Sequence, residues 1–317
     1  MAKSKKKVAT KKKKLPIAHW SHSSLMSFLR NPLAWHKRYV EKIYDTPSNP
    51  AGVIGRSGHV ALEHFYLQVR EHQATILESL DRANAGGKIS SDYLLKKSYS
   101  GADKETAKRL GLEYLRSVAD FEINFGKATS ARAKKAKRLL MEKDLLQAVG
   151  FYLARAPRHK VLGVEVSGIA SVPGHALPLK AISDLVVESR AKPGHVDIVD
   201  HKFVDAFSKS GAGKPLFVIQ AIFNYYTVSE MFGLPVGKFI VYECKKRKNK
   251  DGSSQMRRYV LDYAAVRDEF KVFQRLINDA TREMMTRKVF LPNPSDMFEG
   301  ENSFDLYRLE LVDEETI

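Results

Sequence analysis

The sequence contains a single cysteine, Cys244, among 317 residues. No disulfide framework, and no zinc or iron–sulfur site made of several cysteines, can therefore form within one chain. There is also no uninterrupted apolar run near the roughly 18 to 20 residues that a membrane-spanning helix needs, and no short apolar segment follows the basic start as in a signal peptide. These absences predict a soluble, cytoplasmic protein with no membrane partner.

Positive charge is in excess, with 53 lysine and arginine residues, 36 aspartate and glutamate residues and a formal charge of +17. Such an excess predicts a polyanionic partner, because neutralising phosphates releases counterions and gives sequence-independent affinity. Eight lysines lie in residues 1–15, and without them the charge is 17 − 8 = +9, so the rest of the chain is basic as well. Nucleic acid is the leading candidate partner.

Residues 1–15 have too little apolar content to pack, and we expect a disordered basic tail. Three roles stay open for this tail: a nuclear localisation signal, a non-specific nucleic-acid arm, or a solubilising extension. Its lysines are Lys3, Lys5, Lys6, Lys7, Lys11, Lys12, Lys13 and Lys14.

Residues 16–160 have mainly helical patterns. Ser21 to Ser24 offer N-cap side chains, and Asn31-Pro32 separates two short predicted helices. Apolar residues at helical spacing predict three longer helices further on. These helices span about 53–80, 102–125 and 131–154.

The pattern changes at Val161, where β-branched residues and turn signals predict strands. The first three strands are joined by turns at Pro173-Gly174 and Lys192-Pro193-Gly194, which predicts an antiparallel meander. The fold class is therefore α/β (α+β), with a mixed, largely antiparallel sheet flanked by helices and preceded by a helical region. We expect strands at about 161–169, 177–188, 196–204, 236–243 and 257–261, helices at about 215–232 and 264–288, a core of 161–290 and a C-terminal extension of 291–317.

Two aspartates flank the second of these turns at equal distance. Asp184 and Asp200 each lie eight residues from Lys192, so hairpin pairing should bring their carboxylates together. Neighbouring carboxylates repel each other unless a cation lies between them. Because hard oxygen ligands suit Mg²⁺ or Mn²⁺, the pair predicts a divalent metal site.

Lys202 follows Asp200 by two residues, and strand periodicity places both side chains on one face. An ammonium beside a metal and a phosphodiester can offset the negative charge of a hydrolytic transition state. The alternative is an exposed strand end with an ordinary ion pair. Apolar neighbours such as Val187 and Val199 favour the metal interpretation, because an unpaired charge is costly there.

The order and spacing of these motifs resemble the PD-(D/E)XK nuclease superfamily, and within it the RecB-like exonuclease branch. Members of the branch have a Gly-x-x-x-His helix, a Glu-bearing strand, a strand with the first Asp, a (D/E)-x-Lys strand and a helix that starts with Gln. The resemblance covers about residues 21–293 and implies a restriction-endonuclease-like core. The matching positions are Gly55 to His59, Glu165, Asp184, Asp200 to Lys202, and Gln220 followed by Tyr225.

By this resemblance, Mg²⁺ or Mn²⁺ is bound by His59, Asp184, Asp200 and the backbone carbonyl of His201, and the helical region 16–160 contributes His59 to the site. Lys202 is implied to be the catalytic lysine.

Three further residues take their roles from the resemblance. Glu165 either assists the metal site or is a solvent-facing strand residue. Gln220 and Tyr225 are implied to position the substrate or the lysine. The family has its Tyr four residues after the Gln, whereas Asn224 stands there in this chain, and this departure puts the role of Tyr225 in doubt.

Several members of the branch carry an iron–sulfur cluster. Asn31 stands at the position of the first cluster cysteine, and no cysteine follows Pro292, so we expect no iron–sulfur cluster. A helicase motif of the type Gly-x-x-x-x-Gly-Lys-Ser/Thr is also lacking.

Basic segments could guide a nucleic-acid strand. They comprise Lys134, Lys135, Lys137 and Arg138 on a predicted helix, and Lys245, Lys246, Arg247, Lys248 and Lys250 in a loop between strands.

The resemblance therefore implies a metal-dependent DNA exonuclease that hydrolyses phosphodiester bonds in DNA recombination, repair or phage DNA metabolism, in the cytoplasm of a bacterial or phage-infected host cell. Two alternatives stay open: a structure-specific or nicking endonuclease, and a catalytically inactive nucleic-acid-binding protein of the same fold. A recombination partner protein and a homo-oligomer are both compatible with the sequence.

Overall fold

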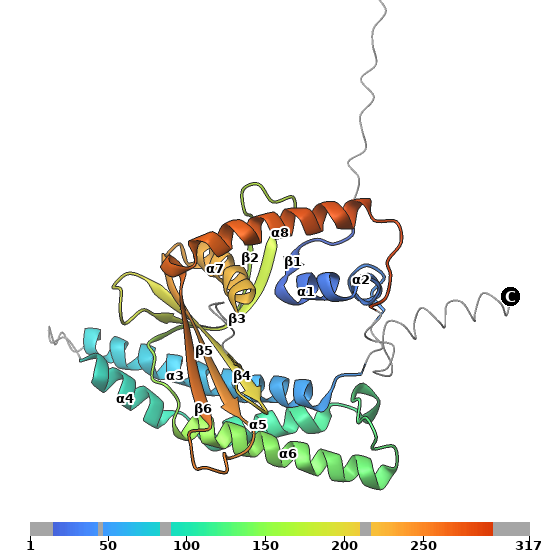
Figure 1. Cartoon of the computed structure of the whole chain (residues 1–317). Helices are drawn as coiled ribbons and strands as arrows, with labels where there is room; N and C mark the ends of the chain where they lie inside the picture. The colour runs from blue at the N-terminus through green and yellow to red at the C-terminus, as the bar shows by residue number, and fades with distance from the viewer. Residues whose placement is uncertain (1–14, 44–46, 83–89, 210–216, 294–317) are drawn as a thin grey trace, which may run out of the picture.

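The computed structural model describes residues 15–43, 47–82, 90–209 and 217–293. A six-stranded sheet lies at its centre, and helices cover both faces (Figure 1). The predicted fold class is confirmed, including the largely antiparallel sheet. Nearly all of the predicted basic tail and most of the predicted C-terminal extension lie outside the described residues. In the part of the chain that is described, no helix combines the length and apolarity needed to cross a membrane.

The first three long strands form the predicted meander, in which β2 and β4 both pair antiparallel with β3. β5 pairs parallel with β4 after a helical crossover, and β6 returns antiparallel to β5. A two-residue strand, β1, adds parallel to the start of β3, which the sequence did not indicate. The strands are β1 (Trp20–Ser21), β2 (Val161–Ala170), β3 (Leu179–Glu188), β4 (Val196–Val204), β5 (Val236–Lys245) and β6 (Met256–Asp262).

Both faces of the sheet are apolar because helices cover both. On β3, Val187 packs towards α3 and α6, whereas Val186 packs towards α7. On β4, Val199 likewise packs towards α3 and α6, and Ile198 towards α7. This burial explains why β4 carries apolar residues on both faces, around the three charged residues Asp197, Asp200 and Lys202. The covering helices are α3 (Pro50–Arg82) and α6 (Ala131–Ala154) on one face, and α7 (Val218–Phe232) and α8 (Arg267–Thr286) on the other.

The helical region contains more elements than the sequence indicated. The predicted helix 102–125 is in fact shorter, because it ends at Ser117 and a separate 3₁₀ turn follows at Asp120–Glu122. Asp103 caps its start by accepting from the N–H groups of Glu105 and Thr106. An additional helix precedes it and buries Leu94 and Leu95. The remaining elements are α1 (His22–Arg30), α2 (Pro32–Trp35), the π-helix η1 (His36–Val40), α4 (Ser91–Gly101), α5 (Lys104–Ser117), and the 3₁₀ helices η2 (Asp120–Glu122) and η3 (Tyr263–Ala265).

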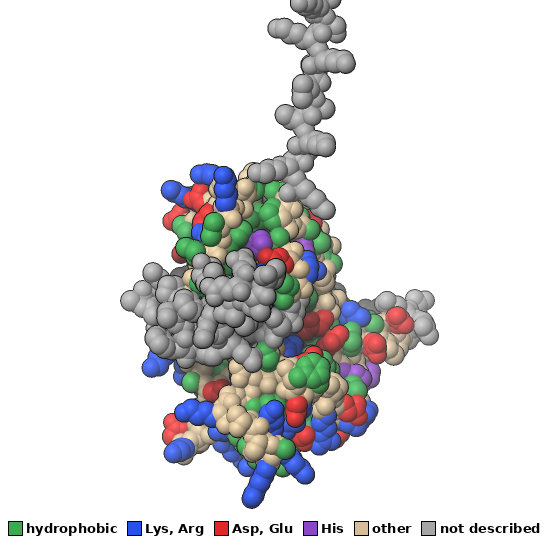
Figure 2. All heavy atoms as spheres, turned by 90° about the vertical axis from the view of Figure 1, so that its right-hand side faces the viewer, with side chains coloured by type: hydrophobic (Ala, Val, Ile, Leu, Met, Phe, Trp, Pro, Cys, Tyr) green, Lys and Arg blue, Asp and Glu red, His purple; other side chains and the backbone are tan. Residues whose placement is uncertain are grey.

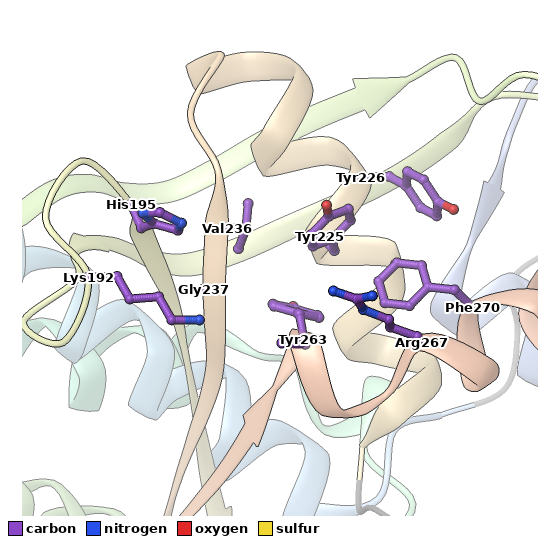
Figure 3. Close-up of a pocket in the computed structure, with 10 residues that line it drawn as sticks. Lys192, His195, Tyr225, Tyr226, Val236, Gly237, Tyr263, Arg267 and Phe270 are labelled. Carbon is purple, nitrogen blue, oxygen red and sulfur yellow. The ribbon is translucent and has the colours of Figure 1, made fainter.

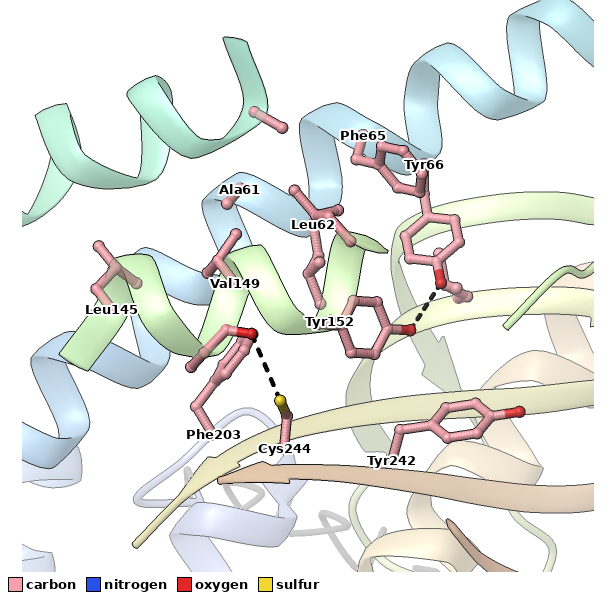
Figure 4. Close-up of a cluster of buried hydrophobic side chains, with 14 of the residues drawn as sticks. Ala61, Leu62, Phe65, Tyr66, Leu145, Val149, Tyr152, Phe203, Tyr242 and Cys244 are labelled. Carbon is pink, nitrogen blue, oxygen red and sulfur yellow. Dashed lines mark hydrogen bonds between the residues drawn. The ribbon is translucent and has the colours of Figure 1, made fainter. Parts of the chain in front are cut away.

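The largest core lies between α3, α6 and the sheet (Figure 4). Its residues include Cys244, whose thiol is buried and donates to the carbonyl of Ala148 at 3.5 Å. Burial raises the pKa of Cys244 to about 12, so this cysteine is a structural residue and not a reactive one. Tyr66 and Tyr152 bring hydroxyl groups into the same core, where they hydrogen-bond each other at 2.7 Å (Figure 4).

His159 makes the stability of this core dependent on pH. Burial, reinforced by the nearby His201 and two arginines, lowers the pKa of His159 to about 3 from its ordinary 6.5. Between pH 3 and 6.5 the unfolded chain binds a proton at this position and the folded chain does not. The free energy of unfolding should therefore fall on acidification through this window, with a slope of up to about 1.4 kcal/mol per pH unit.

Denaturant unfolding of the intact chain and of His159→Gln at several pH values tests this dependence. We expect a smaller slope between pH 6.5 and pH 3 for the variant. Equal slopes for both chains would show that other groups cause the acid sensitivity.

Candidate metal centre

The site lies where β3 and β4 diverge. Their ladder ends at the pair Leu185–Val199, one residue before the positions of Asp184 and Asp200. Beyond this pair, the backbone N–H of His201 donates to Asp184 Oδ2 at 2.6 Å. The predicted register of the hairpin is thus observed, and the carboxylate of Asp184 takes a backbone partner at the opening between the strands.

Three side chains from three elements converge at this opening. His59 Nδ1 of α3 lies 3.4 Å from Asp184 Oδ1 of β3 and 3.7 Å from Glu165 Oε1 of β2. One ligand atom from each of the three lies within 4.8 Å of the others, which is a spacing that could hold a metal ion. Glu165 also lies opposite Asp184 in the β2–β3 register, between the pairs Val164–Leu185 and Val166–Ser183.

The approach of α3 to the sheet depends on a glycine. A Cβ at Gly58 would lie 2.2 Å from Phe203 Cε2, so the helix or the Phe203 ring would have to shift to accommodate any other residue. At Gly55, the first residue of the sequence motif, an added Cβ would have no atom within 4 Å. Gly58 therefore lets the helix pack directly on β4, and this contact brings the adjacent His59 to the site.

A second group of side chains lies beside the first. Asp200 Oδ2 lies 2.8 Å from Lys202 Nζ, while Gln220 Nε2 donates to Asp200 Oδ1 at 2.6 Å. Lys202 Nζ donates in turn to Gln220 Oε1 at 3.1 Å, so the three residues form a closed triangle. Gln220 lies in the first turn of α7, and Phe217, the residue before the helix, places its ring 5.3 Å from Lys202 Nζ.

The charges at the site are not balanced by the protein alone. Burial raises the pKa of Asp200, and the charge of Asp184 raises it further, against the effect of Lys202. Burial alone would also raise the pKa of Asp184, but the charges and hydrogen bonds of His59 and His201 hold this pKa well below its usual range. Burial lowers the pKa of His59, but Asp184 and Glu165 outweigh it and hold this pKa well above the ordinary value. Asp200 Oδ2 is also buried without a hydrogen bond in good geometry from any described residue.

This donor set fits a hard divalent cation. Carboxylate oxygens suit Mg²⁺ and Mn²⁺, imidazole is accepted by Mn²⁺, and the excess of negative charge favours a cation. The structure brings together His59, Glu165 and Asp184, whereas Asp200 is held by Lys202 and Gln220 and lies outside this group of three.

A family model for the PD-(D/E)XK nuclease superfamily matches residues 19–297. The chain belongs to this superfamily. Membership implies a phosphodiester hydrolase that uses a divalent metal, and the candidate ligands His59, Glu165 and Asp184 agree with that requirement.

Among solved structures, this nuclease chain is similar to a candidate exonuclease from Eubacterium rectale, with a TM-score of 0.41 and 10% identity over 90% of this chain and 94% of the other. It is also similar to a protein designated SSO0001, with a TM-score of 0.27 and 14% identity over 90% of this chain and 93% of the other. No curated protein matches the nuclease chain in sequence.

The residues of the candidate site offer groups for two chemical tasks, metal binding and charge stabilisation. A divalent ion supplies positive charge and Lewis acidity to the phosphodiester when it is bound. His59, Glu165 and Asp184 are the residues that would hold it. Lys202 places an ammonium next to the site, where it can offset negative charge that develops on phosphate. Gln220 fixes the position of that ammonium through its side-chain oxygen.

Glu165 contributes more than its place in the sequence indicated. Its backbone φ is +46°, a left-handed conformation that L side chains rarely adopt within a strand. The carboxylate nevertheless faces His59 and stands among the three candidate ligands. Of its two predicted roles, this geometry favours metal binding over a solvent-facing strand residue. A strand pattern contains no signal for a positive φ, so the sequence could not reveal it.

Replacing Glu165 by glycine should have opposite effects on the stability of the protein and on its metal binding. Glu165→Gly should raise the free energy of unfolding by about 1 kcal/mol, because glycine adopts a positive φ without steric cost. The same change should weaken Mn²⁺ binding. Glu165→Ala is the matched control, since it removes the carboxylate but keeps the strain. Equal unfolding free energies for the two variants would contradict the account.

The sequence predicts a role only for the backbone carbonyl of His201. The side chain of His201 lies on the other face of β4, where it has a structural role. His201 Nδ1 lies 3.3 Å from Asp184 Oδ2, and its Nε2 is 2.7 Å from the hydroxyl of Tyr152. Tyr152 is bonded in turn to Tyr66, so a buried chain of hydrogen bonds leads from the core to a candidate metal ligand. No sequence motif links residues so far apart in the chain.

Removal of one hydroxyl from this chain should destabilise the protein. Tyr152→Phe leaves His201 Nε2 and the Tyr66 hydroxyl without their partner in the core, and we expect the free energy of unfolding to fall by about 1–3 kcal/mol. Denaturant unfolding measures the loss. Tyr93→Phe serves as control, because Tyr93 is 52% exposed on α4. A loss of similar size in the control would contradict this role for the hydroxyl.

Tyr225 is not brought to the metal centre. It packs against Tyr263 and Phe270, with ring centroids 4.9 and 5.0 Å away, on a different side of α7 from Gln220. Asn224 occupies the position at which the family has its tyrosine, and it accepts a hydrogen bond from Ser183, next to Asp184, at 2.6 Å. The single-residue displacement of Tyr225 turns its ring by about 100° around the helix.

The basic loop after β5 is partly engaged within the protein. Lys246 is buried and pairs with Asp205 at 3.0 Å, while Arg247 makes two hydrogen bonds, of 2.9 and 2.8 Å, to Asp144. Lys245 bonds to Asn249 in the same loop. Of the five predicted residues, Lys248 and Lys250 are the two that are both exposed and without an ion pair to another described residue.

Proposed function

We propose that this nuclease is a metal-dependent DNA exonuclease. One observation carries the proposal: a three-residue ligand group, His59, Glu165 and Asp184, lies beside an ammonium group, Lys202, that is held by Asp200 and Gln220. The arrangement offers a cation site and a fixed positive charge for the same phosphate. It therefore supports hydrolysis of a phosphodiester bond over binding alone.

DNA as the substrate, and strand ends as the point of attack, are supported by the resemblance to the RecB-like exonuclease branch. The formal charge of +17 supports a polyanionic substrate. On the face shown in Figure 2, lysine and arginine side chains gather at the lower end, where α6 lies in Figure 1. Lys135 and Lys137 are exposed on that helix, whereas Arg138 is bound to Asp120. The exposed lysines, with Lys248 and Lys250, are the proposed guides for the strand. Mg²⁺ or Mn²⁺ is the proposed metal, and DNA recombination or repair in a cytoplasm is the proposed setting.

The test compares linear duplex DNA with covalently closed circular DNA, each with Mg²⁺, with Mn²⁺ and with EDTA. We expect loss of the linear DNA only, and only when metal is present. Cleavage of the circle would replace the proposal with an endonuclease. Tight binding to DNA with no cleavage under any metal would replace it with an inactive nucleic-acid-binding protein.

A further inference from the structure

A cavity of about 510 Å³ lies away from the metal centre, between the turn that joins β3 to β4, the start of β5, the middle of α7 and the start of α8 (Figure 3). His195, on its wall, precedes Asp200 by five residues, which corresponds to about 16 Å of strand. The cavity is therefore separate from the nuclease site, and none of the candidate metal ligands lines it.

Two cationic side chains enter the cavity from opposite walls. Lys192 comes from the β3–β4 turn, Arg267 comes from the first turn of α8, and both head groups point into the space between them (Figure 3). Neither has an ion pair or a ring contact with another described residue, and the described lining contains no carboxylate. Lys192 is partly exposed and Arg267 is exposed. Two cations that face one space without a carboxylate between them give it a positive potential, which favours an anionic ligand.

The remaining wall is aromatic. Tyr225 and Tyr226 come from α7, Tyr263 from η3 and Phe270 from α8, and their rings pack edge-on or tilted against each other. The hydroxyl of Tyr263 donates a hydrogen bond to the carbonyl of Ala221, whereas the hydroxyl of Tyr225 has no hydrogen-bond partner among the described residues. Such a wall offers faces and edges to a planar ring, together with one free hydroxyl.

We propose that this cavity binds a nucleoside 5′-monophosphate unit, with Lys192 and Arg267 on the phosphate and the aromatic wall against the base. The volume suits a ligand of that size. Two cations without partners account for a phosphate, and the rings account for a base. The unit belongs either to a free nucleotide or to an unpaired nucleotide within a DNA strand. The proposal concerns binding without metal, so it does not depend on the nuclease activity proposed above.

The test is calorimetric titration of the full chain in EDTA with deoxyadenosine 5′-monophosphate, deoxyadenosine and inorganic phosphate, at one ionic strength. We expect one nucleotide per chain, bound at least tenfold more tightly than either fragment. The double variant Lys192→Ala/Arg267→Ala should lose at least tenfold in nucleotide affinity. The matched control is Lys96→Ala/Arg132→Ala, which removes the same charges from exposed positions on α4 and α6.

Unchanged affinity in the double variant would overturn the proposal, as would an equal loss in the control. Equal affinity for the nucleotide and for phosphate would also overturn it, because the cavity would then be a simple anion site. Titration with a deoxyadenosine tetranucleotide separates the two sources. Binding at least tenfold tighter than that of the mononucleotide, and lost in the double variant, assigns the cavity to a DNA strand; otherwise a free nucleotide is its ligand.

Discussion

With Asp184 replaced by Asn, Mn²⁺ affinity should fall by more than about 100-fold. Even the loss of a residue that only hydrogen-bonds to a metal ligand lowers metal affinity by about 10- to 100-fold, and a direct ligand should matter more. DNA hydrolysis at fixed metal concentration should fall with it. The asparagine oxygen can still accept the hydrogen bond that the N–H of His201 gives to Asp184, so the opening between β3 and β4 should keep its shape. The substitution therefore removes the charge and leaves the scaffold.

Calorimetric titration with Mn²⁺, alongside degradation of linear DNA, measures both effects. Glu188→Gln is the matched control, since Glu188 is an exposed carboxylate at the end of the same strand and pairs with Lys160. The control should bind Mn²⁺ and cleave DNA as the intact chain does. Normal Mn²⁺ affinity in Asp184→Asn would remove Asp184 from the ligand set and leave His59 and Glu165 to be tested in its place.

The positions of Asp184 and Asp200 could be predicted because hairpin register is a local property. Partners in a two-stranded ladder are equidistant from the turn, and the observed pair Leu185–Val199 lies seven residues on either side of Lys192. Strand alternation likewise placed Lys202 beside Asp200. Most strand boundaries follow from the same short-range patterns and agree with the structure within two residues.

The rest of the site depends on contacts between distant parts of the chain. His59 reaches the sheet because Gly58 packs on Phe203, and nothing near Gly58 in the sequence specifies that neighbour. Glu165 has a positive φ between two regular pairs with β3, and nothing in the side chain of a glutamate favours that conformation. The predicted basic loop shows the same limit, because a count of charges could not reveal that Arg247 is bound to Asp144, 103 residues away.

Lys202→Met should separate catalysis from metal binding. Methionine keeps an unbranched apolar stem beside Phe217 but has no ammonium, and we expect the rate of hydrolysis at saturating DNA to fall by about 10²–10³-fold, as for other fixed donors to transition-state charge. Mn²⁺ affinity should be retained or increase, because a positive charge 2.8 Å from Asp200 has been removed. Asp184→Asn, by contrast, should lose both properties.

The matched control for this change is Lys180→Met, which removes a half-buried lysine from β3, near the start of the strand. It should leave the rate unchanged. If Lys202→Met lost Mn²⁺ affinity as well, the role of Lys202 would be to hold Asp200 and Gln220 in place, and the loss of rate would follow from a distorted site. If it hydrolysed DNA at the normal rate, the ammonium would have no part in the reaction. Retained metal with lost turnover is the outcome that assigns Lys202 to the chemical step.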